Sequence, residues 1–159
     1  MHRGPKDRSM NRFCSRRPFA LVLAAVGVLA LAAAPARAAE RRHASRGTAQ
    51  FVNANDFVGA GTATHLGLYD EEGSAEFSPT ADPTVFEVDA WATYAAANGD
   101  ELYAVFTGHL NGVTGAITAT VTYVGGTGRF ADAGGTATLS AQLLPGGSIE
   151  VAVEGTIDY

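Results

Sequence analysis

The sequence contains almost no cysteine, tryptophan or lysine. Among its 159 residues it has one cysteine, Cys14, one tryptophan and one lysine. Cys14 lies in a predicted signal peptide, so the mature protein is expected to have no cysteine, which excludes disulfides, a thiol nucleophile and cysteine-ligated metals. Beyond residue 38, no segment repeats apolar residues with a helical period. We therefore expect a fold without helices that is stabilised by its core alone.

The first 38 residues are typical of an export signal. A basic segment precedes an apolar run over residues 19–34, and Ala36-Arg37-Ala38 places small residues at the two positions that a signal peptidase reads. The apolar run is shorter than the roughly 20 residues of a membrane-spanning helix, so we expect cleavage after Ala38. Residues 15–21 match the twin-arginine pattern, which leaves that route and general secretion as alternatives. The sequence thus predicts an exported bacterial protein, periplasmic or extracellular.

Cations are scarce once this signal is removed. Seven of the eleven basic residues and one of the sixteen acidic residues precede the cut, which leaves a net charge of −11. Arg41, Arg42 and Arg46 lie in a charged stretch, residues 39–46, that is predicted to be a flexible leader. Arg129 is then the one cation of the predicted folded domain, residues 47–159. Nucleic acids and anionic membranes bind clustered lysine and arginine, so neither is an expected partner.

The remaining sequence alternates apolar and polar residues with a period of two, which is typical of half-buried strands. Turn residues recur at 97–100, 111–112 and 145–147, each between two alternating runs. A meander of such strands removes its exposed edges by closing into a barrel, whose interior is filled by side chains or holds one small ligand. The sequence therefore predicts an all-β, eight-stranded antiparallel barrel. Its expected strands cover residues 48–53, 60–69, 73–78, 84–95, 101–110, 113–124, 135–143 and 148–158.

Two glycine-rich segments resemble a known superfamily. Gly125-Gly126-Thr127-Gly128-Arg129-Phe130 resembles the signature turn of the allene oxide cyclase and dirigent barrels, and residues 61–67 resemble an early-strand pattern of their bacterial relatives. The resemblance implies a small β-barrel, a homotrimer as a candidate assembly, and cofactor-free isomerase or cyclase chemistry. The chain continues Ala131-Asp132-Ala133-Gly134, and so lacks two cations that plant dirigent proteins have after this turn.

Five side chains on two predicted strands are candidates for the lumen. His65 and Tyr69 are expected on one face of the second strand, where they would form an acid–base or hydrogen-bonding pair if that face lines the lumen. The alternative is a partly buried structural histidine. Glu87, Asp89 and Trp91 share one face of the fourth strand. An acidic pair beside a tryptophan could hold a polar ligand inside a barrel, whereas the same pattern also describes a solvated outer face.

Arg129 and the acidic residues 70–73 each have a structural interpretation as well as a functional one. Arg129 is either an anion anchor at the barrel mouth or the partner of Asp132 or another acid in an ion pair that fixes the long turn. Residues 70–73, Asp-Glu-Glu-Gly, are expected to form a solvated turn, because they lack the spaced ligands of a calcium loop. The sequence has no zinc-type histidine spacing, nucleophile elbow or phosphate loop, so no metal or cofactor is expected.

Three functions are compatible with this sequence. The favoured one is binding of a small, mostly apolar molecule in the lumen. The second, implied by the resemblance, is a cofactor-free isomerase or cyclase in which His65, Tyr69, Glu87 or Asp89 would steer protons. The third is a structural or assembly protein with a packed interior. The volume of the lumen and the polar side chains inside it discriminate among the three, because fold alone does not fix function.

Overall fold

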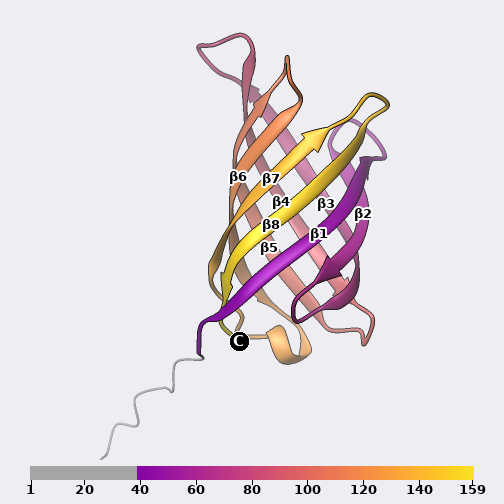
Figure 1. The fold of residues 1–159 in the computed structure, drawn as a ribbon, viewed down its shortest axis with the longest axis vertical. Helices are drawn as coiled ribbons and strands as arrows, with labels where there is room; N and C mark the ends of the chain where they lie inside the picture. The colour runs from indigo at the N-terminus through magenta and orange to yellow at the C-terminus, as the bar shows by residue number, and fades with distance from the viewer. Residues whose placement is uncertain (1–38) are drawn as a thin grey trace, which may run out of the picture. The chain divides into compact units, whose positions relative to one another are not determined.

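The computed structural model describes residues 39–159, so the predicted signal peptide of residues 1–38 lies outside the described part. The described chain forms a closed barrel in which each strand is antiparallel to its neighbours in sequence order (Figure 1). One 3-10 turn, η1 (Gly128–Phe130), lies between the sixth and seventh strands. The all-β, eight-stranded antiparallel barrel is confirmed. Its strands are β1 (Arg41–Phe51), β2 (Asp56–Ala63), β3 (Gly67–Pro79), β4 (Val85–Ala96), β5 (Glu101–Asn111), β6 (Ala116–Gly126), β7 (Thr136–Leu143) and β8 (Ser148–Ile157).

The barrel closes through the pairing of its first and last strands. β1 pairs with β8 from Arg41↔Ile157 to Gln50↔Ser148, and on its other side with β2. Each of the eight strands therefore has a partner on both sides, so the described sheet has no free edge that could pair with another chain.

The prediction of a flexible leader over residues 39–46 is wrong, because residues 41–46 form the first half of β1. The alternation is present there, with His43 and Ser45 buried inside the barrel and Arg42 and Arg46 exposed outside. The sequence does not reveal this pattern, because the inward residues His43 and Ser45 are polar rather than apolar and the arginines make the whole segment charged.

The predicted boundary between the second and third strands is also wrong. The chain turns at residues 64–66, whereas the expected acidic turn at residues 70–73 lies inside β3. His65 and Gly67 adopt positive φ angles of 86° and 73° and supply the reversal that an Asn-Gly pair often provides. Apolar and polar residues keep alternating through residues 64–66, so the sequence pattern does not indicate a turn there. The other predicted turns, at residues 97–100, 111–112 and 145–147, do join neighbouring strands.

The two ends of the barrel differ in how they are filled. The closed end, at the bottom of Figure 1, carries the connections at residues 64–66, 97–100 and 127–135 together with the C-terminus. The open end carries the connections at residues 52–55, 80–84, 112–115 and 144–147. Of the four largest fully buried side chains, Leu102, Phe130 and Ile157 lie toward the closed end, and Val121 lies midway along β6.

The segment around η1 closes its end of the barrel as a plug. Phe130 is fully buried, and its ring lies 4.9 Å from that of Tyr159, over which the Arg41 guanidinium stacks. Backbone hydrogen bonds between Gly134 and Asp158 tie the plug to the end of the chain. Ligand access through this end is therefore blocked by packed side chains.

Replacing Phe130 with alanine is expected to lower the free energy of unfolding by about 3 to 5 kcal/mol, because the removed ring leaves a cavity in a fully packed region. Denaturant unfolding followed by circular dichroism measures this change. Val113→Ala is a suitable control, since Val113 is 76% exposed in a turn at the open end. A loss for Phe130→Ala as small as that of the control would contradict the role of η1 as a plug.

Candidate functional site

A cavity occupies the half of the lumen nearest the open end. Its volume is about 70 Å³, and a cavity that holds one water needs about 10–15 Å³. Side chains from all eight strands line it, and Glu71 is the one polar residue among them. The apolar lining residues are Ala49, Phe51, Phe57, Ala75, Phe77, Val88, Ala90, Phe106, Ile117, Ala119, Leu139, Ala141, Ile149 and Val151.

An aromatic group frames the mouth of this cavity. The ring of Phe51 lies 6.1 Å from that of Phe57 and 5.9 Å from that of Phe77, in edge-to-face geometries that aromatic pairs favour. All three residues are partly exposed. Deeper inside, several inward positions carry alanine, and these small side chains leave the space that the cavity occupies. The result is an apolar pocket with an aromatic entrance.

Glu71 lies at the inner end of this apolar pocket. Its carboxyl packs over Gly59 of β2, where an added Cβ would lie 3.0 Å from Oε2, so the glycine makes room for the acid. The Tyr94 hydroxyl donates a hydrogen bond to the carboxyl. Burial raises the pKa of Glu71 to about 7, and the Tyr94 hydrogen bond partly opposes that rise. Glu71 can therefore carry or release a proton near neutral pH.

Below Glu71 the lumen narrows to a polar chamber lined by tyrosines. The Tyr69 ring lies edge-on to that of Tyr94, with centroids 5.2 Å apart, and its hydroxyl hydrogen-bonds Ser45. Burial, followed by the nearby charge of Glu71, raises the pKa of Tyr69 to about 12 and that of Tyr94 well above its usual value. The pKa of Tyr123 is raised by burial too. These hydroxyls therefore stay protonated and can act as donors.

His43 forms the far wall of this chamber. The residue is only 3% exposed, and its Nδ1 is buried without a hydrogen-bond partner. Its ring lies edge-on to Tyr123 and 6.2 Å from that of His65. Burial, and to a smaller extent the charge of His65, lowers the pKa of His43 to about 4. The imidazole is therefore neutral at physiological pH.

The predicted pairing of His65 with Tyr69 on one strand is wrong. His65 lies in the β2–β3 turn, where its Nε2 is 2.9 Å from the backbone oxygen of Arg42, and its ring contacts Tyr159 at the closed end. Tyr69 does face the lumen, in β3. The position of His65 therefore supports the alternative of a partly buried structural histidine.

The second group of candidates lies on the outside of the barrel. Glu87, Asp89 and Trp91 are all exposed on the outer face of β4, and Trp91 is 52% exposed. Their inward-facing neighbours in β4, Val88 and Ala90, line the cavity instead. The interpretation as a luminal ligand site is thus wrong for these three residues, and that of a solvated face is confirmed.

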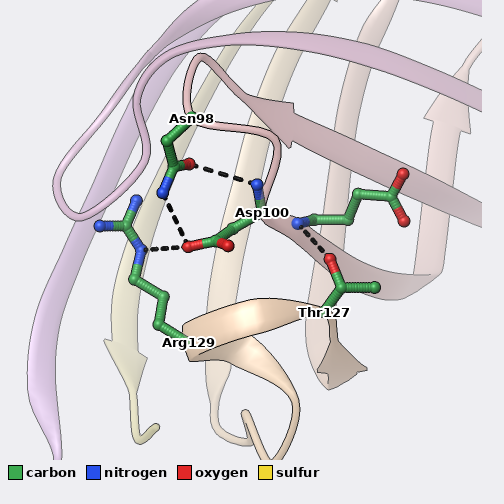
Figure 2. Close-up of polar contacts among 5 residues, drawn as sticks. Asn98, Asp100, Thr127 and Arg129 are labelled. Carbon is green, nitrogen blue, oxygen red and sulfur yellow. Dashed lines mark hydrogen bonds and ion pairs between the residues drawn. The ribbon is translucent and has the colours of Figure 1, made fainter.

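Arg129 also lies outside the lumen. Its Nε is 3.4 Å from Asp100 Oδ2 in the β4–β5 turn, and Asn98 donates a 2.8 Å hydrogen bond to the same oxygen (Figure 2). Beside this pair, the Glu101 amide donates to the Thr127 hydroxyl. The ion-pair alternative is therefore confirmed, with Asp100 rather than Asp132 as the partner, and it fixes the segment that carries η1.

Sequence reasoning missed the acid that does face the lumen. From the sequence we predict a turn at Glu71, although Tyr69, Gly73, Ala75 and Phe77 alternate with it as inward residues of one long strand. A charged residue at an inward position of that series is the signal that could have identified it. His43 and Tyr94 escaped notice because nothing in the sequence places either residue near Glu71.

Comparisons with known proteins add no function. No protein-family model matches the chain, and no characterised protein matches it significantly. Among residues 39–159, no helix is long and apolar enough to cross a membrane. In the same part of the chain, no three side chains of His, Cys, Asp or Glu gather closely enough to hold a metal ion. The function must therefore be argued from the lumen.

Half-buried Glu71 and buried His43 are expected to give the stability of the protein opposite dependences on pH. The folded protein keeps the Glu71 proton up to about pH 7, whereas the unfolded chain loses it near 4.5, so this contribution to stability falls as pH rises from 4.5 to 7. Folded His43 stays neutral down to about pH 4, whereas the unfolded imidazole is protonated below 6.5, so its contribution rises with pH from 4 to 6.5. The two effects oppose each other where these windows overlap.

Single variants separate the two contributions. Relative to the wild type, Glu71→Gln is expected to gain stability as pH rises from 4.5 to 7, by at most about 1.4 kcal/mol per pH unit. His43→Phe is expected to show the reverse trend, with a relative gain as pH falls from 6.5 to 4. Denaturant unfolding at closely spaced pH values measures both trends. Parallel profiles for the wild type and Glu71→Gln would contradict the burial of this carboxyl.

Proposed function

We propose that the barrel binds a small, mostly apolar molecule in the half of its lumen nearest the open end. The observation that carries this proposal is the cavity itself, whose walls are apolar except for Glu71. Ligand sites are commonly apolar pockets with a few polar groups that fix the orientation of the ligand. The aromatic mouth formed by Phe51, Phe57 and Phe77 would then be the entrance, and Glu71 the polar anchor.

The contrast between the two halves of the barrel favours binding over a purely structural role. Toward the closed end, side chains such as Leu102 and Phe130 are fully buried, and the polar chamber beside them has a volume of only about 10 Å³. Toward the open end, Ala49, Ala119 and Ala141 occupy inward positions where larger apolar side chains would improve packing. An unfilled apolar cavity reduces stability in proportion to its volume, so its presence is better explained by an occupant than by a role as scaffold.

The position of Glu71 opposes the same structural role. A carboxyl in an apolar environment destabilises a fold unless it is protonated or paired, and a leucine at this position would avoid that penalty. Hydrogen bonding by Tyr94 and the space left at Gly59 accommodate the acid. An arrangement that retains a destabilising group at the inner end of a pocket is typical of functional sites.

Filling the cavity is expected to abolish binding while the barrel still folds. Ala141→Phe places a ring into the cavity from β7, whereas Ala60→Phe places the same ring on the exposed face of β2. Native mass spectrometry of the protein purified from its own host measures the outcome. We expect a stoichiometric small-molecule adduct on the wild type and on Ala60→Phe, and none on Ala141→Phe.

The same measurement can refute the proposal. A bare mass for the wild type across several preparations, together with unchanged stability in Ala141→Phe, would favour a barrel without a ligand. An adduct that survives in Ala141→Phe would place the binding site elsewhere on the molecule.

A second candidate is a cofactor-free isomerase or cyclase, as the family resemblance implies. Its support from the geometry is a carboxyl with a pKa near neutrality at the inner end of an apolar pocket, which suits proton transfer to or from a bound molecule. In this version Glu71 would carry the proton, rather than His65, Glu87 or Asp89. If the adduct is identified, Glu71→Gln should retain its binding and lose its turnover.

Several predictions from the sequence accompany this proposal. Export from a bacterial cell, the homotrimer and membership of the allene oxide cyclase and dirigent superfamily stay predictions. Arg41, Arg42 and Arg46 lie on β1 of the barrel, but the net charge of −11 beyond residue 38 stays the argument against nucleic acid and anionic membranes as partners.

A further inference from the structure

We propose that the luminal ligand is an uncharged molecule whose polar end is a hydrogen-bond acceptor, such as a ketone or ether oxygen, held by the protonated carboxyl of Glu71. This inference rests on the proposed luminal binding and adds the chemistry of the ligand's polar end. Three features of the lumen lead to it: its charges, its unused hydrogen-bonding groups and its apolar walls.

The charges of the lumen exclude an anionic ligand. No cation lines the cavity, and its one ionisable side chain is an acid. Arg46 is exposed on the outer face of β1, and Arg129 is paired with Asp100 outside the closed end. A carboxylate or phosphate in the cavity would therefore meet no counter-charge and would lie against another acid, an arrangement that is strongly unfavourable in an apolar environment.

The other residues that line the cavity offer no hydrogen-bond acceptor to a protonated Glu71. Tyr94 donates to Glu71, so the protein already supplies a donor to the carboxyl. When protonated, the carboxyl has one O–H group to donate, and every other residue lining the cavity is apolar. An acceptor oxygen on the ligand would complete this set, and a buried donor without a partner is costly.

The walls of the cavity disfavour a cationic ligand. An alkylammonium group has three N–H donors, and Glu71 is the one side chain in the cavity that could accept from them. Both charges would also lose their hydration, and the attraction within a single ion pair in an apolar pocket does not fully offset that loss. The raised pKa of Glu71, caused mainly by burial, agrees with a carboxyl that takes up a proton instead.

Glu71 is the group around this site that changes charge near neutrality. The titratable side chains nearest to it are Tyr69 on its own strand, Tyr94 on β4 and Tyr123 on β6, and burial raises the pKa of each. His43 on β1 is neutral above about pH 4. On β2 the carboxyl lies against Gly59, which carries no titratable group. Binding that depends on the Glu71 proton should therefore weaken as the pH rises through about 7.

Four probes of similar size test this inference: 2-heptanone, heptylamine, heptanoate and toluene. Their affinities for the purified protein are measured by NMR titration between pH 5.5 and 9. We expect 2-heptanone to bind most tightly and to lose affinity above neutrality by up to about tenfold per pH unit. In Glu71→Gln, whose amide donates at every pH, 2-heptanone should bind without pH dependence. Glu72→Gln, the same change on the exposed face of β3, should behave as the wild type.

Each alternative outcome overturns a defined part of the account. Tightest binding of heptylamine, with affinity that rises with pH, would replace the neutral ligand with a cation. Tightest binding of heptanoate would contradict the charge argument. Equal binding of 2-heptanone and toluene at every pH would overturn the role of the Glu71 proton while luminal binding survives. If no probe binds, toluene included, luminal binding itself fails.

Discussion

The pairing of β1 with β8 is the constraint on which the rest of the structure depends. Ten register pairs join these strands and convert a meander into a closed barrel. Closure places every second residue of each strand in one shared interior. It also explains the unusual composition of β1, in which arginines face solvent while His43 and Ser45 face the lumen. The interior is thus set by which residues occupy the inward positions.

Those inward positions divide the lumen into regions with different properties. Large side chains and the η1 plug fill the closed end, tyrosines and His43 form a polar chamber above it, and small apolar residues leave a cavity toward the open end. Glu71 lies between the chamber and the cavity, hydrogen-bonded to Tyr94 on one side and facing apolar walls on the other. A single acid therefore lies between the packed half of the barrel and the half that contains the cavity.

The sequence alone predicts the barrel well where alternation and turns agree. From β4 to β8 the apolar faces and the Gly- and Asn-rich turns indicate the same strands that the structure contains. The prediction fails at residues 64–66, because the alternation continues through a turn made by His65 in a left-handed conformation. That single error moved Glu71 from a strand into a turn. It also placed His65 and Tyr69 on one face, and so concealed the site.

The central claim is that the half of the lumen nearest the open end is a ligand site with Glu71 at its inner end. A high-resolution crystal structure of the protein purified from its own host tests this claim most directly. The account predicts electron density for a small molecule between the aromatic mouth and Glu71, with one polar atom at hydrogen-bonding distance from the carboxyl. A cavity filled by its own side chains, with no density beside Glu71, would contradict it.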